Sequence, residues 1–361
     1  MYKKAIMILT FFLCPVMMLA GEDSLSVDKP SRLKGILKSA YNFIKEFSRV
    51  DTNFVEPQHY NFQAMIQSTS SYEFYRMKNK TGQSVSLAPE MSVRVGPYVG
   101  WRWIFLGYTF DFKHISSNNK KEIDLSLYSN QIGFDVFLKN TGNDYKIRRM
   151  DLGKDIDASA LKDIPFDGFK GSISGFNLYY IFNHRKFSYP AAFSQSTVQR
   201  VSCGSWLAGV GYTRHSLQLD YEKLRDIVEE KISDPIVNDG LDTTLVFSKV
   251  KYKDFSASMG YAYNWVFAHN WLLAGSLSLA LGYKKSVGDL ESKSFSFRDF
   301  SFSNFNIDGV SRIGIVYNNT KWFAGLSAIF HTYNYKKDQF TSNNIFGNLN
   351  LYIGFNFMRQ K

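Results

Sequence analysis

Apolar and polar residues alternate with a period of two over most of the chain after residue 60. In residues 255–265 one face collects Phe255, Ala257, Met259, Tyr261, Tyr263 and Trp265, and the positions between them are small or polar. The segments 271–283, 322–330 and 345–357 follow the same rule. Because successive side chains of a strand point to opposite faces, this pattern predicts many strands with one apolar face.

Strand length, turns and tryptophans distinguish a membrane barrel from a soluble sandwich, which alternates as well. Several segments exceed the roughly 10 residues that a tilted membrane strand needs. Short turns are expected at 96–100, 140–144, 183–186, 213–216, 268–270 and 318–320, and longer polar links at 116–121, 151–168, 225–241, 286–294 and 336–343. Most tryptophans lie near the short turns, as an interfacial girdle requires; only Trp206 lies farther away.

These features predict an all-β fold, an antiparallel transmembrane β-barrel of about 12–14 strands over residues 59–358. We expect the short turns and both ends of the mature chain on the periplasmic side, and the longer loops outside the cell. The segment 187–202 does not fit this pattern well, because Pro190 and its mixed polarity weaken any strand prediction.

The N-terminal residues indicate secretion. Lys3 and Lys4 precede an apolar run that ends at small residues, so residues 1–20 are predicted to be a signal peptide. Residues 21–58 then form a periplasmic segment in which apolar residues at helical spacing predict an amphipathic helix over 31–48. Two interpretations of that helix are open. In one it lies on the inner leaflet or plugs the barrel mouth, and in the other it packs on the barrel rim. Removal of the signal leaves only Cys203, so no internal disulfide forms.

Composition agrees with a barrel and indicates its surroundings. The mean hydropathy is −0.23 although 17% of residues are aromatic, so apolar residues are numerous but dispersed. The formal net charge is +11. A basic chain in the bacterial outer membrane meets anionic lipid and lipopolysaccharide, which are the expected partners, and no nucleic-acid-binding signature occurs. A small solute is a possible further partner.

Three stretches resemble a known family. They are NFVEPQHY at 53–60, GWRWIFLGY at 100–108 and FNLYYIFNHR at 176–185. They are similar to an uncharacterised family of bacterial secreted proteins, known only as a domain of unknown function. The resemblance covers most of the mature chain. It implies an outer-membrane barrel and says nothing about catalysis, so no functional residues carry over.

Strand parity predicts a polar network inside the barrel. If the apolar side chains of the 99–115 strand face lipid, then Asp111 and Lys113 face the lumen. The same parity turns Glu73, Arg94, Asp124 and Asp135 inward. Ionisable groups at membrane depth are costly unless they are paired or hydrated. They therefore either line a water-filled path or pair with one another across a filled interior. Barrels of this strand number do both.

A second hypothesis is an outer-membrane lipid hydrolase. His114 and Ser116 lie two residues apart at the outer end of a strand, which places both on one face. A histidine that takes the serine proton makes a nucleophile. The ordinary interpretation is a histidine and a serine at a loop edge. Because the motif consists of two common residues, the sequence favours a protein that is not an enzyme.

The sequence predicts no metal or cofactor. His59, His184, His215 and His269 are expected near the periplasmic rim, without metal-ligand spacing, and turn or interface roles suit them better. No phosphate-cradling loop, paired-Cys zinc motif or nucleophile elbow occurs. The chain is therefore expected to be a small channel or a structural and interaction protein. The alternatives are the lipid hydrolase and a soluble secreted β-barrel binder.

Overall fold

The computed structural model describes residues 50–101, 104–107, 110–111, 121–142, 144–153, 156–232, 250–286, 304–336 and 340–359. The expected signal peptide at 1–20 and the expected helix at 31–48 lie outside these residues. No helix in the described part of the chain is long and apolar enough to cross a membrane.

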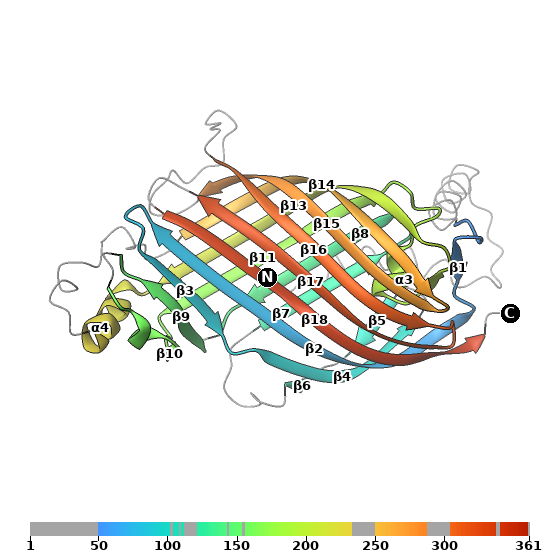
Figure 1. Ribbon diagram of the computed structural model, residues 1–361, viewed down its shortest axis with the longest axis horizontal. Helices are drawn as coiled ribbons and strands as arrows, with labels where there is room; N and C mark the ends of the chain where they lie inside the picture. The colour runs from blue at the N-terminus through green and yellow to red at the C-terminus, as the bar shows by residue number, and fades with distance from the viewer. Residues whose placement is uncertain are drawn as a thin grey trace, which may run out of the picture. The chain divides into compact units, whose positions relative to one another are not determined.

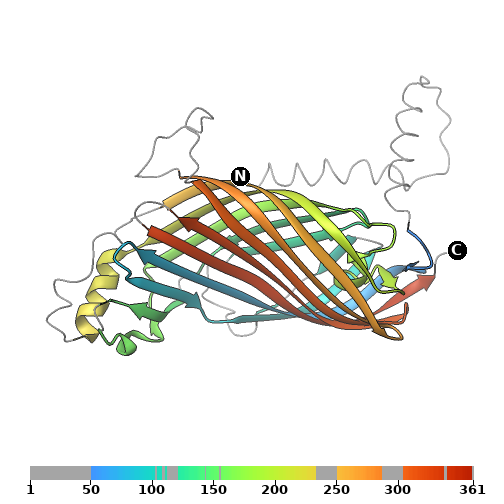
Figure 2. The ribbon, with the colours of Figure 1, turned by 45° about the horizontal axis from the view of Figure 1, so that its top comes forward.

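One antiparallel sheet of 16 strands forms the wall of the protein and curls on itself (Figures 1 and 2). Its long strands are β2 (Tyr60–Asn79), β11 (Phe169–Ile181), β13 (Cys203–Leu219), β14 (Val250–Ala268), β15 (Trp271–Ser286), β16 (Phe305–Asn318), β17 (Trp322–Lys336) and β18 (Phe340–Arg359). Shorter strands are β4 (Ser92–Trp101), β5 (Ile104–Gly107), β6 (Phe110–Asp111), β7 (Lys121–Tyr128) and β8 (Ile132–Asn140). The fold is an antiparallel transmembrane β-barrel, as predicted.

The wall follows the chain almost in order. The neighbours run β2–β18–β17–β16–β15–β14–β13–β11–β8–β7, and β4 continues from β2 to pair with β5 and β6. The long strands β2 and β18 lie side by side, with Tyr60 opposite Arg359 and Asn79 opposite Phe340. Hairpin connections explain this order, because they place each strand beside the one before it.

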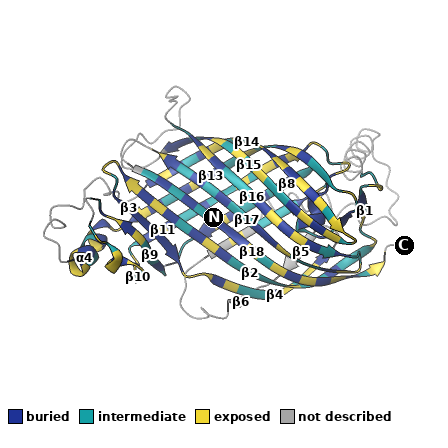
Figure 3. Cartoon of the chain, viewed as in Figure 1, coloured by how far each residue is buried: buried dark blue, intermediate teal, exposed yellow. Residues whose placement is uncertain are grey.

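Inner and outer faces alternate along every long strand (Figure 3). In β14 the odd positions from Phe255 to Trp265 are exposed, whereas Asp254 and Asn264 are buried. This confirms the alternation predicted for 255–265. The outer face carries large exposed apolar residues, among them Leu277, Leu279, Leu281, Ile313, Leu351 and Ile353. A face of this kind needs lipid around it, which excludes the soluble alternative.

The barrel has two different ends. The terminal end carries the start of β2, the finish of β18 and the connections 129–131, 182–202, 269–270 and 319–321. The loop end carries the connection 80–83 and the opposite ends of the long strands, at Leu219, Ser286 and Lys336. Two predicted turns are wrong, because 96–100 lies within β4 and 213–216 within β13. Gly96, Gly100, Thr213 and His215 are buried there, and together with the polar residues beside them they imitate turn composition.

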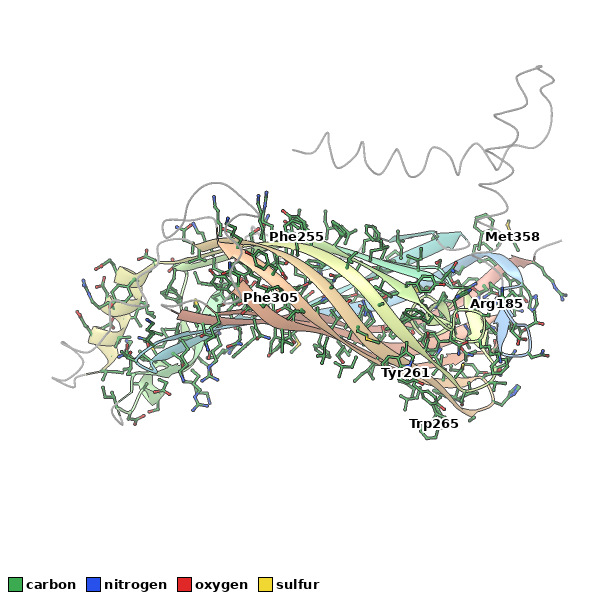
Figure 4. The ribbon with its side chains drawn as sticks, turned by 90° about the horizontal axis from the view of Figure 1, so that it is seen from above. Arg185, Phe255, Tyr261, Trp265, Phe305 and Met358 are labelled. Carbon is green, nitrogen blue, oxygen red and sulfur yellow. The ribbon has the colours of Figure 1, made fainter. Side chains whose placement is uncertain are left out.

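Aromatic side chains form two belts on the outer face. Trp206, Tyr261, Trp265, Trp271 and Trp322 lie near the terminal end, and Tyr212, Phe255, Tyr283 and Phe305 lie near the loop end. Figure 4 labels two members of each belt. From Phe255 to Trp265 a tilted strand rises roughly 25 Å, which is the height of an apolar membrane band. Trp206, the exception in the sequence, belongs to the belt because it lies opposite Tyr261.

Candidate functional site: the closed interior of the barrel

A buried ion pair crosses the middle of the barrel. Arg312 on β16 donates from Nη2 to Asp135 on β8, and their side chains are 3% and 2% exposed. Four strands separate β8 from β16 along the wall, so this contact runs through the interior. Ser126 on β7 donates to the other oxygen of Asp135 at 2.7 Å, and the Arg312 guanidinium lies 5.0 Å from the Tyr179 ring. The charges are thus paired and hydrogen-bonded, as burial requires.

Aromatic rings fill the next layer toward the loop end. Phe137 on β8 lies 5.5 Å from the rings of both His331 on β17 and Phe346 on β18. Lys139, also on β8, lies 4.9 Å from the Phe346 ring. His215 on β13 stacks on Tyr252 of β14 at 4.4 Å and lies 5.0 Å from the Tyr333 ring on β17. Side chains of opposite walls therefore meet, and no open passage runs between these described residues.

A second charged cluster joins four neighbouring strands. Lys284 on β15 donates to Asp308 Oδ1 on β16 and to the carbonyl oxygen of Asn334 on β17, both at 2.6 Å. Asp254 on β14 lies 4.0 Å from the same ammonium group. A Cβ atom at Gly282 would lie 2.5 Å from Asp254 Oδ1, so this crowded layer requires glycine there.

The space left beside these charges is small. A cavity of about 30 Å³ is lined by Asp135, Arg312 and Asp308 together with small residues such as Ser256, Ser258 and Ser278. This volume holds about two water molecules. Water in this cavity would hydrate the charged groups, but the cavity has no room for a solute.

A separate segment closes the terminal end. We call residues 187–199 the plug; it contains α3 (Tyr189–Phe193) and β12 (Thr197–Gln199), and β12 pairs with β1 (Val55–Pro57). Ser188 caps α3 by accepting from Ala191 N, and Pro190 suits the first helical turn because it lacks an N–H. The segment that resisted strand prediction is therefore a helical insert.

The plug contacts strands all round the wall. Tyr189 stacks on Tyr128 of β7 at 5.8 Å. Asn264 on β14 donates to the carbonyl oxygen of Ser188 at 2.8 Å, and Gln195 donates to Tyr352 Oη on β18 at 2.7 Å. Tyr189 and Ala192 are fully buried. The plug is thus part of the packed interior and not a loop on the rim.

The loop end is covered by a cap formed by β9 (Tyr145–Asp151), η1 (Ser159–Leu161), β10 (Ile164–Pro165) and α4 (Tyr221–Lys231). β9 pairs with β3 (Ser84–Pro89), and β3 pairs in turn with the loop-end part of β2. Leu224 and Val228 of α4 are buried in the same apolar cluster as Tyr75 and Phe169. On the outer side of the cap, Arg148 donates to Asp163 at 2.6 Å and lowers the pKa of that carboxyl group.

The structure places the expected lumen residues as follows. Glu73 is buried and accepts from Tyr145 Oη at 2.9 Å, and Arg94 donates to Ser71 Oγ at 2.9 Å. Asp111 lies directly opposite Arg94 in the register, and Asp124 opposite Phe137, but their side chains lie outside the described residues, as does all of Lys113. Asp135 is brought together with Arg312, which the sequence did not single out.

The hydrolase hypothesis stays a prediction, because His114 and Ser116 lie outside the described residues. The histidine expectation needs a correction at His215, which is buried inside the barrel and not at a rim. His59 lies 3.0 Å from Glu56, and His184 lies 3.3 Å from the carbonyl oxygen of Ile181. The error at His215 follows from reading 213–216 as a turn.

Four interior residues were missed by the sequence analysis: Asp254, Lys284, Asp308 and Arg312. A signal for them was present. Each alternates with large outward residues, as Asp308 does with Ile307 and Arg312 does with Ile313. Strand parity gives the inward direction of these side chains, but it does not give the residue on the opposite wall that each one meets.

Comparisons with known proteins give a family and a distant structural likeness. The outer membrane protease OmpT of Escherichia coli is 9% identical, with 82% of this chain and 97% of that chain covered and a TM-score of 0.35. The toluene transporter TodX of Pseudomonas putida is 9% identical, covering 83% and 91%, with a TM-score of 0.25. The translocator domain of the autotransporter NalP of Neisseria meningitidis is 10% identical, covering 91% and 96%, with a TM-score of 0.25.

No curated protein matches the sequence. One family does, and its match runs through residues 49–357, which include the barrel wall up to the last two residues of β18, the plug and the cap. The protein belongs to the family described as Domain of unknown function (DUF4421).

Proposed function

We propose that this protein is a closed outer-membrane barrel with a structural and interaction role, and not an open channel. The observation that supports this function is the contact of opposite walls, in which Arg312 meets Asp135 and Phe137 meets His331 and Phe346. Breaking a buried ion pair costs several kcal/mol, so these contacts oppose thermal opening. The plug adds a second closure at the terminal end.

Planar-bilayer conductance of the refolded mature protein tests the proposal. Heat-modifiable gel mobility shows that the sample is folded. We expect no unit steps from the wild-type protein. A variant without the plug that also carries Phe137→Gly and Arg312→Ser serves as the positive control, because it removes both inner closures; it should conduct. Reproducible steps from folded wild-type protein would overturn the closed barrel.

The proposed orientation places the terminal end in the periplasm and the loop end outside the cell. The short connections 129–131, 269–270 and 319–321 at the terminal end support it, since short periplasmic turns and longer outer loops are the convention in such barrels. Lys162→Cys adds a thiol on the exposed outer side of the cap, whereas Cys203 lies at the terminal end. A PEG-maleimide too large for porins should label Lys162→Cys on intact cells and leave Cys203 unlabelled. Labelling of Cys203 alone would reverse the orientation.

A further inference from the structure

The outer face of β11, β13 and β14 bears a continuous aromatic row near the loop end. Phe176 lies 6.3 Å from Tyr212, and Tyr212 lies 4.8 Å from Phe255. Phe255 is opposite Tyr283, which is opposite Phe305. Such a row marks the boundary between acyl chains and headgroups.

Cations occupy the next outward row, about 7 Å farther along the strands. Arg214 lies directly opposite Lys253, and Lys253 directly opposite Lys285. Lys285 is nearly buried, whereas Arg214 is exposed and Lys253 half-buried. Residues directly opposite each other on one face have Cβ atoms about 5 Å apart, and like charges there are destabilising. An anion that contacts Arg214 and Lys253 would offset the repulsion between these two cations.

Within the described residues the two strands supply no such anion. The residue opposite Arg214 on its other side is Ser174, and Asp254 beside Lys253 points into the barrel. Lys251, one row farther out, is opposite Ser216 and adds a further exposed cation. The surface is thus basic at headgroup height.

An apolar groove lies against this basic row. It has a volume of about 500 Å³ and is lined by Phe176, Val210, Gly211, Tyr212, Lys253 and Phe255. Val210 lies on the outer face between the aromatic side chains and is 56% exposed. Lys253 is the charged member of the lining, so one end of an apolar slot carries a cation. This is the shape and polarity of a site for an acyl chain with a phosphate at its head.

We propose that the groove and the cations Arg214 and Lys253 bind lipopolysaccharide of the outer leaflet, with a lipid A phosphate on the cations and an acyl chain in the groove. The inference rests on the proposed orientation, because the loop end must face outward for this row to meet that leaflet. It does not depend on whether the lumen is closed. Charge complementarity favours lipid A, which carries two phosphates, over a zwitterionic phospholipid.

Native mass spectrometry of the folded mature protein in detergent, titrated with diphosphoryl lipid A, tests the site. Arg214→Ser with Lys253→Ser should weaken binding at least about tenfold, since each cation near an anionic headgroup contributes to affinity. Arg76→Ser with Lys78→Ser is the matched control, because both residues are exposed on β2 at the same end. That control should stay within about twofold of the wild-type affinity.

Two further measurements separate the headgroup from the chain. Val210→Trp fills the groove and should also weaken lipid A binding, whereas Met259→Trp, an exposed change on β14 outside the groove lining, should not. Dephosphorylated lipid A should bind the wild-type protein weakly, and inorganic phosphate should not displace lipid A. If the Arg76 and Lys78 control loses as much affinity for lipid A, the effect is general charge attraction and not a site. Unchanged binding by the Arg214 and Lys253 variant would refute the site.

Discussion

The middle of the barrel and its terminal end are both closed, but by different means. In the middle the wall closes itself, because large or charged side chains of β8 reach those of β16, β17 and β18. At the terminal end the inward residues of several strands are small, as at Gly260, Ala262 and Ala274, and the plug fills the space. A wall of given strand number thus accommodates either long inward side chains or an inserted segment. The plug could move out of the barrel without a change in strand register, whereas the inward side chains of the wall could not.

The largest expected effect breaks the closure in the middle. Arg312→Ala leaves the Asp135 carboxylate buried without its cation, so unfolding should become easier by about 3–5 kcal/mol. Urea unfolding in detergent, followed by tryptophan fluorescence, measures this change. Arg312→Met combined with Asp135→Leu removes both charges and should recover most of the loss. If Arg312→Ala destabilises the protein no more than Arg148→Ala, which breaks an exposed ion pair, then the buried ion pair does not support the middle of the barrel.

A smaller effect is expected at the terminal end. Tyr352→Phe removes the oxygen that accepts from Gln195, and leaves a buried amide with only the carbonyl of Ala192 at 3.3 Å. The cost should be about 1–3 kcal/mol. Hydrogen exchange should rise in residues 187–199 and stay unchanged in β8 and β16. Tyr261→Phe, an outward tyrosine, is the control. A rise in exchange throughout the wall would mean that the plug and the middle form one cooperative unit.

The smallest effect concerns the cap, outside the membrane band. The hydrogen bond from Arg148 lowers the pKa of Asp163 from its ordinary 3.8. The stabilisation from this pair is therefore present above that pH and is lost as the pH falls through the lowered value. Asp163→Asn should lower the thermal midpoint slightly at neutral pH, and the two midpoints should converge once the pH falls below the lowered pKa of Asp163. A difference that persists in acid would point to a cause other than the carboxylate charge.

The sequence predicted the outer face of the barrel better than its interior. Period-two alternation places Phe255, Tyr261 and Trp265 outward because lipid imposes one demand, apolarity, on all outward positions. The interior imposes different demands at each height. The pairing of Arg312 with Asp135 depends on the register of the strands between them, and one of those strands, β13, was expected to contain a turn at 213–216.

The plug could not be predicted by the same reasoning, for a related reason. Pro190 and Ser188 were signals of a helix start, but five helical residues are too few for a period of 3.6 to show. Its burial depends on the small inward residues of distant strands. Local propensity therefore identified an interruption in the strand pattern, and only the assembled wall shows what fills the gap.

The pairing of β2 with β18 has a consequence for how long the folded barrel lasts. The two strands run side by side from Tyr60 opposite Arg359 to Asn79 opposite Phe340, and their residues Gln67 and Asn350 are 283 positions apart in the chain. Contacts this distant in sequence form late, so closure of the ladder is expected to be a slow step of folding. Once it is made, the whole ladder must break before β2 and β18 can separate. The lifetime of the barrel is therefore set by the rate of that separation and not by the equilibrium free energy alone.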